Sequence, residues 1–69
     1  MNADTMRYLL EGQVESFRSL SSINTELFVE TEDDYFKGKA QAYTLAAESY
    51  ESMIRNYLPK EVADVGNAD

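Results

Sequence analysis

A chain of 69 residues without Cys or His forms one domain at most, and it lacks disulfides, thiolate ligands and imidazole groups. Its 13 acidic and 6 basic side chains give a net charge of −7. This charge argues against direct binding to nucleic acid and against attraction to anionic membranes.

The size of the chain also limits how stable it can be alone. A domain this short buries only about 60% of its unfolded surface, so we expect self-association or docking on a partner to supply stability. No apolar run approaches the roughly 20 residues that span a bilayer, and the first residues do not resemble a signal peptide. We therefore expect a cytoplasmic protein.

The first predicted helix covers about residues 4–30, with Asn2 or Asp4 as its N-cap. Ser21 and Ser22 are poor helix formers and weaken the helix in its second half. Its core-facing positions recur at alternating steps of four and three, which keeps side chains on one helix face. They are Met6, Leu10, Gln13, Phe17, Leu20, Asn24 and Leu27, and Leu9, Val14, Ile23 and Phe28 flank them and widen this core-facing side.

Residues 30–34 interrupt the pattern with four acids in five residues. Thr31 and Asp34 have the spacing of a capping box, which predicts that a second helix starts here. A recognition role for an acidic turn is the alternative. The alternating acids, central Gly and distal Glu of a calcium-binding loop are missing.

The second predicted helix covers about residues 32–58 and ends before Pro59. Residues 59–69 are predicted to be a mobile acidic tail. Two long helices joined by a short turn predict an all-α fold, an antiparallel hairpin over residues 1–58. The core-facing positions of the second helix are Phe36, Ala40, Tyr43, Ala47, Tyr50, Ile54 and Tyr57.

A second stripe on this helix consists mostly of small side chains beside the core-facing positions. Small side chains at this spacing allow another helix to approach closely, and the Leu and Met among them need cover. The stripe predicts a homodimer in which two hairpins form a four-helix arrangement. Its residues are Gly38, Ala42, Leu45, Ala46, Ser49 and Met53.

Exposed tyrosines among carboxylates form the predicted partner-binding surface. Aromatic rings give a large contact area at low entropic cost, and the acidic charge steers the chain towards a protein with a basic surface. The predicted residues are Tyr8, Glu11, Glu15, Glu26, Glu32, Asp33, Asp34 and Tyr35.

The sequence offers no pattern for catalysis. Glu48 and Glu51 lie three residues apart, but no Glu-x-x-His element completes a di-metal site. The serines have no His to activate them, and there is no Gly-rich phosphate loop. We therefore expect a non-enzymatic protein with no cofactor and no metal.

Residues 35–43, Tyr-Phe-Lys-Gly-Lys-Ala-Gln-Ala-Tyr, continue through Ala46, Ala47 and Glu48. This stretch resembles the second helix of small helical-hairpin accessory proteins encoded by bacteriophages. The resemblance implies an early protein that binds a host protein in the host cytoplasm and inhibits or redirects it. The implied targets are transcription regulators, nucleases and other defence components.

Three functions follow as hypotheses. The first is a dimeric binding protein that blocks a host macromolecule by direct contact. The second is a DNA mimic whose carboxylates occupy a nucleic-acid-binding groove, although only the turn is dense in acids. The third is a scaffold subunit whose second stripe builds a larger assembly.

Overall fold

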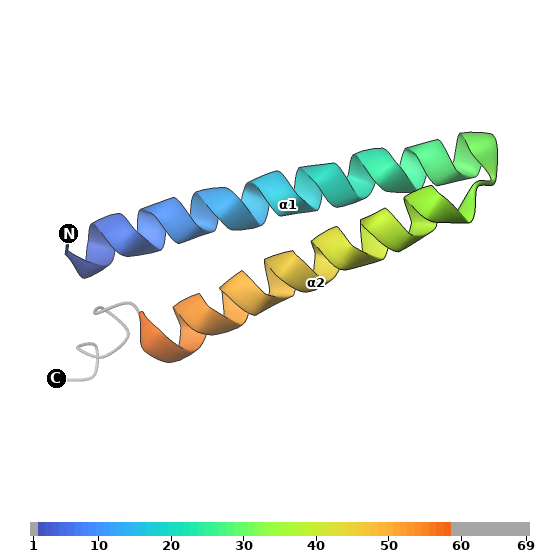
Figure 1. Ribbon diagram of the computed structural model, residues 1–69. Coiled ribbons are helices and arrows are strands. Elements are labelled where there is room, and N and C mark those ends of the chain that lie inside the picture. Colours follow the sequence, from blue (N-terminus) through green and yellow to red (C-terminus); the bar gives the residue numbers. More distant parts are fainter. Residues whose placement is uncertain (1, 59–69) are drawn as a thin grey trace, which may run out of the picture.

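The computed structural model describes residues 2–58, which form two antiparallel helices, α1 (Ala3–Thr31) and α2 (Asp34–Tyr57), joined by a tight turn (Figure 1). The prediction of an all-α hairpin is confirmed. Neither helix combines the length and the hydropathy needed to cross a membrane. The predicted acidic tail, residues 59–69, lies outside the described part of the chain.

Asn2, one of the two predicted caps, starts α1. Its side-chain oxygen accepts a hydrogen bond of 2.8 Å from the backbone N–H of Thr5, which satisfies one of the free amides at the helix N-terminus. The helix then continues without a break through Ser21 and Ser22 to Thr31. Ser21 hydrogen-bonds to Ala40 and Thr44 of α2, whereas Ser22 is exposed.

The turn differs from the predicted capping box. Thr31 is the last residue of α1, and its hydroxyl donates to the carbonyl of Leu27 and accepts from the N–H of Asp33. Asp33 is the N-cap of α2 and accepts from the N–H of Tyr35 at 2.9 Å. The capping-box prediction was wrong because Thr31 still belongs to α1, and α2 begins two residues later than predicted.

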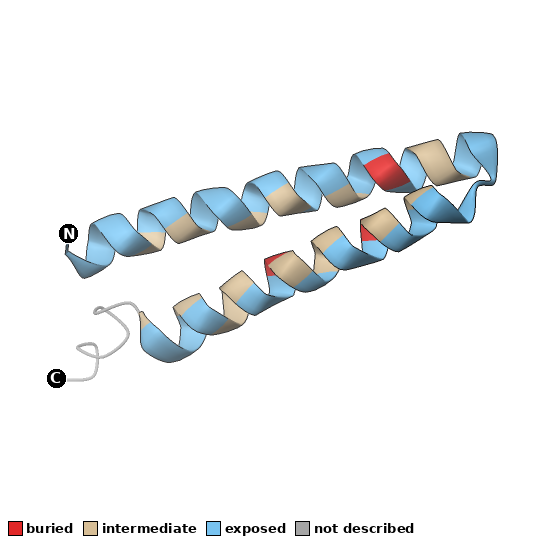
Figure 2. Cartoon of the chain, viewed as in Figure 1, coloured by how far each residue is buried: buried red, intermediate tan, exposed pale blue. Residues whose placement is uncertain are grey.

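The predicted core-facing side of α2 packs against α1, except at its end. Ala40 and Ala47 are buried, and Phe36, Tyr43, Tyr50 and Ile54 are half-buried (Figure 2). Tyr57, in the last turn, is exposed.

The core-facing side of α1 is rotated relative to the predicted one. Met6 and Leu20 are 40% and 37% exposed, and Gln13 is also exposed. Val14 and Ser21 occupy the half-buried positions instead. Leu10, Phe17, Asn24 and Leu27 keep the predicted side, so the prediction was wrong at three of its seven positions.

Aromatic stacking and two polar contacts hold the helices together. The ring of Phe17 lies between Tyr43 and Tyr50, with centroid distances of 6.0 and 5.7 Å. The hydroxyl of Ser21 hydrogen-bonds to the carbonyl of Ala40 at 3.0 Å and to the hydroxyl of Thr44 at 2.7 Å. These two hydrogen bonds explain why Ser21, rather than the more apolar Leu20, faces α2.

Few residues are removed from water. Within residues 2–58 only Asn24, Ala40 and Ala47 are buried, and no large side chain is fully buried. Asn24 is 4% exposed and donates a 2.8 Å hydrogen bond to the carbonyl of Leu20 in its own helix. Among the described residues no buried side-chain nitrogen or oxygen atom lacks a hydrogen-bond partner.

We predict that Phe17→Ala lowers the free energy of unfolding by about 3 kcal/mol, because it removes both stacked contacts and leaves a cavity. Urea unfolding followed by circular dichroism measures the loss. Phe17→Leu retains much of the volume and should lose less than half as much. A loss below about 1 kcal/mol for Phe17→Ala would show that the stacked rings do not hold the hairpin together.

We predict that Glu32→Gly stabilises the hairpin by about 1 kcal/mol, since Glu32 has a φ of 58° and glycine adopts this left-handed conformation without strain. Glu32→Ala is the matched control, because it removes the same charge but keeps the strain. Thermal melts should rank the glycine variant above both the alanine variant and the wild type. Equal melting temperatures for the two variants would assign the effect to charge.

Candidate functional site

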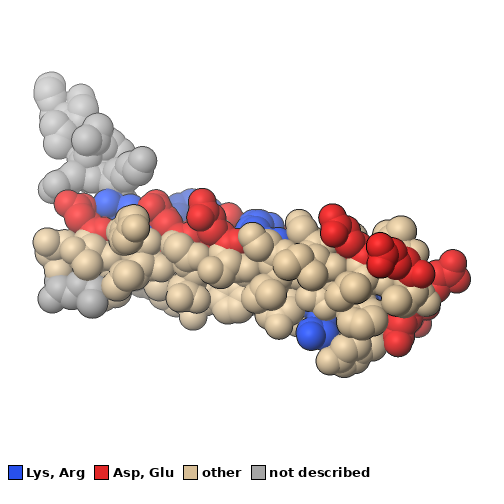
Figure 3. Space-filling view, turned by 90° about the horizontal axis from the view of Figure 1, so that it is seen from above, with Lys and Arg blue, Asp and Glu red and all other residues tan. Residues whose placement is uncertain are grey.

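The two long sides of the hairpin differ in charge. Arg18 and Glu51 form an ion pair of 2.7 Å across one side, and the Ser21–Thr44 hydrogen bond lies on the same side. We call this side the charged edge, and Figure 3 shows acidic and basic side chains along one long edge and at the turn. The residues that define it are Glu11, Glu15, Arg18, Glu48, Glu51 and Arg55.

Tyr8 lies beside this edge, on the side of α1 that points away from α2. It is 73% exposed, and it shares a shallow hollow on α1 with Glu11, Gly12 and Glu15. We call Tyr8, Glu11 and Glu15 the acidic region of α1. A ring beside two exposed carboxylates provides contact area and charge for a partner.

The turn forms a second acidic area with an exposed tyrosine. Glu32, Asp33 and Asp34 are exposed, and so is Tyr35, whose ring packs edge-on against the neighbouring Phe36. The ammonium group of Lys39 lies 5.3 Å from the centroid of the Tyr35 ring. This cation–π contact holds positive charge close to the carboxylates and moderates their field.

The predicted partner-binding residues therefore fall into separate areas. Glu15 and Glu32 are 17 positions apart, which is about 25 Å along the hairpin. Glu26 is exposed between them, and helical spacing places it on the side of α1 that points away from α2. A partner of ordinary size contacts either the acidic region of α1 or the turn, or spans the length of the hairpin.

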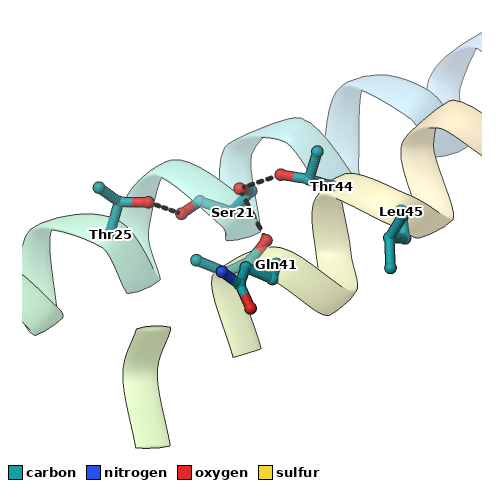
Figure 4. A pocket seen from close by; sticks show the side chains of 6 residues that line it. Ser21, Thr25, Gln41, Thr44 and Leu45 are labelled. Carbon is teal, nitrogen blue, oxygen red and sulfur yellow. Dashed lines mark hydrogen bonds between the residues drawn. The ribbon is translucent and has the colours of Figure 1, made fainter. Parts of the chain in front are cut away.

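The predicted oligomer stripe is also divided. Ala42, Ala46, Ser49 and Met53 lie on the flank of α2 opposite the charged edge, as their spacing from Thr44 and Glu51 requires. Leu45 lines a groove on the charged edge with Ser21, Thr25, Gln41 and Thr44 (Figure 4). By helical spacing Gly38 shares the outer side of α2 with Leu45.

The rotation of α1 reveals a stripe that the sequence analysis missed. The exposed side chains of Met6, Leu9, Leu20 and Ile23 lie on the same side of the hairpin as Ala42 and its neighbours. Together with Gln13 and Ser16 these residues recur at steps of three and four, but Met6, Gln13 and Leu20 were assigned to the core-facing side. We call this side the uncharged face; its residues are Met6, Leu9, Gln13, Ser16, Leu20, Ile23, Ala42, Ala46, Ser49 and Met53.

The described residues gather few of the side chains that hold metals or carry out chemistry. Within residues 2–58 no group of three or more Asp or Glu side chains is placed to hold a metal ion. The hydroxyls of Ser21 and Thr44 are engaged with each other between the helices. What the described residues present are two differently charged sides and an acidic turn.

Searches against protein-family models, curated proteins and solved structures found no match for this chain.

We predict that Gly12→Ala stabilises the hairpin by about 1 kcal/mol, because alanine favours a helix interior over glycine and a Cβ at Gly12 meets nothing within 4 Å. Gly38→Ala has the same open surroundings and is the matched substitution on α2. Urea unfolding at a fixed protein concentration measures both. A decrease for Gly12→Ala would reveal a close contact at this point of α1 that the hairpin alone does not make.

Proposed function

We propose that this chain is a non-enzymatic protein-binding module that acts by direct contact. The observation that carries the proposal is the large number of apolar and tyrosine side chains that the hairpin leaves open to solvent. Exposed apolar surface on this scale favours association with other chains. The exposed residues are Met6, Tyr8, Leu9, Leu20, Ile23, Val29, Tyr35, Leu45, Met53 and Tyr57.

In this proposal the acidic region of α1 meets the partner. Tyr8 supplies an exposed ring of the kind that dominates many protein interfaces, while Glu11 and Glu15 supply negative charge. A partner with a basic surface complements them, and charge complementarity speeds the encounter. The turn, at the far end of the hairpin, serves as a second contact.

The resemblance to bacteriophage accessory proteins suggests what kind of protein the partner is. A small hairpin that covers a basic surface blocks whatever that surface normally binds. The partner is then a host transcription regulator, nuclease or other defence component, and the effect is inhibition or redirection.

Charge placement favours this function over DNA mimicry. A mimic needs carboxylates spaced like phosphates along a continuous path. Here the charged edge also carries Arg18 and Arg55, with Arg18 paired to Glu51. Positive side chains among the carboxylates interrupt any path of phosphate-like charge.

The proposal predicts that Glu11→Lys/Glu15→Lys abolishes capture of a protein partner that the wild-type chain retains at low salt. Reversing two contacting charges replaces attraction by repulsion, and added salt should weaken the wild-type complex. Affinity capture from lysate with mass spectrometry identifies the protein, and titration of that purified protein measures its affinity. Tyr8→Ala should weaken the same complex at least about tenfold.

The matched control is Glu26→Lys/Glu30→Lys, which has the same spacing and changes the charge by the same amount. Both residues are exposed, and they lie closer to the turn. Capture of the partner should weaken less in this variant than in Glu11→Lys/Glu15→Lys, because the turn is only the second contact. Equal losses in the two double variants would indicate a dependence on net charge alone, and retention by both would remove the acidic region of α1 from the interface.

A further inference from the structure

The hairpin is a single layer of two helices, and its uncharged face has no cover among the described residues. Ile23, Leu9 and Met53 on this face are exposed. The apolar residues that the contact between the helices buries are both small, Ala40 and Ala47. Helices with two apolar sides ordinarily bury the second against another layer. The question is which helices supply that layer.

The order of side chains along α1 indicates that a second copy supplies this layer. The pattern of large apolar and polar residues is the same from either end of the stripe. Two large apolar residues, Met6 and Leu9, are followed by Gln13 and Ser16, and then by two more large apolar residues. When an identical helix lies across this stripe in the opposite direction, like meets like in three kinds of layer, each of which occurs twice about the two-fold axis. Each layer joins one copy to a second copy, and the pairs are Met6 with Ile23, Leu9 with Leu20, and Gln13 with Ser16.

Antiparallel pairing of the two copies implies a two-fold axis, and this axis also brings complementary side chains of α2 together. The stacking of Phe17 between Tyr43 and Tyr50 sets the centre of the α1 stripe level with Ser49. Ala46 and Met53 lie on either side of this level, so the small side chain of one copy meets the large side chain of the other. A two-fold interface requires such self-complementarity, and both helices provide it about one axis.

The distribution of charge also favours a dimer in which the two turns lie at opposite ends. Residues 30–34 contain four carboxylates and no cation, so two turns at one end would repel each other. Opposed hairpins instead set each turn beside the open end of the other copy, where Asp4, Arg7 and Arg55 lie. The ten residues that define the uncharged face carry no charge, and Lys39, seven residues before Ala46, borders this face towards the turn.

The area is sufficient for a specific interface. The α1 stripe covers 17 residues, or about 26 Å, and two packed helices are about 20 Å across. Each copy therefore contributes roughly 500 Å², and the pair reaches the total of about 1,000 Å² expected of a biological interface.

We propose that a second copy of this chain covers the uncharged face, with its turn at the opposite end, and that the two hairpins form an antiparallel four-helix bundle. The interface lies on the side opposite the charged edge. The acidic region of α1 borders this interface, because Leu9, Gln13 and Ser16 line the same hollow as Tyr8, Glu11 and Glu15. The two carboxylates themselves lie outside the uncharged face, so Glu11→Lys/Glu15→Lys should leave the dimer intact.

The first test measures mass by sedimentation equilibrium across a range of concentrations. The wild-type chain should be a dimer, and Ile23→Glu should raise the dimer dissociation constant on the order of 100-fold or more, since it places a carboxylate in an apolar layer. Leu45→Glu is the matched control: Ile23 and Leu45 are 51% and 63% exposed, but Leu45 lies outside the uncharged face. A monomeric wild type, or equal effects of both substitutions, would overturn the proposal.

The second test uses complementary charges in the Met6–Ile23 layer. Met6→Lys alone should also dissociate the dimer. Mixing it with Ile23→Glu should restore dimers, because the mixed pair keeps one apolar layer and joins Lys to Glu in the other. Failure of the mixture to dimerise, when the wild type does, would contradict the layer pairing.

The third test measures whether the two turns lie at opposite ends of the dimer or at the same end. The chain contains no Cys, so Glu30→Cys carries a single spin label near the turn. Opposed hairpins place the two labels about 45 Å apart, whereas hairpins with their turns together place them within about 20 Å. Pulsed electron–electron resonance separates these distances, and the short one would refute the antiparallel bundle.

Discussion

Phe17 packs between the rings of Tyr43 and Tyr50, and this stack sets how α1 and α2 are aligned along their length. It brings Ser21 opposite Ala40 and Thr44, where one hydroxyl makes two hydrogen bonds. It also brings Arg18 opposite Glu51. The charged edge and the uncharged face both follow from this alignment.

The rotation of α1 has a cost for the isolated hairpin. Turning Ser21 towards α2 satisfies its hydroxyl, but it leaves Met6, Leu9, Leu20 and Ile23 exposed to water. Each of these side chains forgoes burial that stabilises by about 1.5–3 kcal/mol when complete. A second layer of helices recovers part of that burial, which explains how a short chain without disulfides can prefer this rotation.

The separation of charge gives the two sides different roles. Carboxylates along one edge and at the turn keep the molecule hydrated and repel identical edges. The uncharged face has no such repulsion, and in the proposed dimer the copies meet there and leave the acidic side available. The proposed partner binding and the proposed dimer are therefore compatible in one molecule.

The sequence by itself determined the two helices, the cap at Asn2 and the core-facing side of α2 as far as Ile54, because periodicity and capping are local properties. Only the tertiary structure decided the rotation of α1. Leu20 and Ser21 are neighbours, and apolar spacing favours Leu20, whereas the hydrogen bonds that favour Ser21 come from Thr44 and Ala40, far along the chain. The candidate surfaces were found residue by residue from the sequence, but their division into two sides depends on this contact between helices.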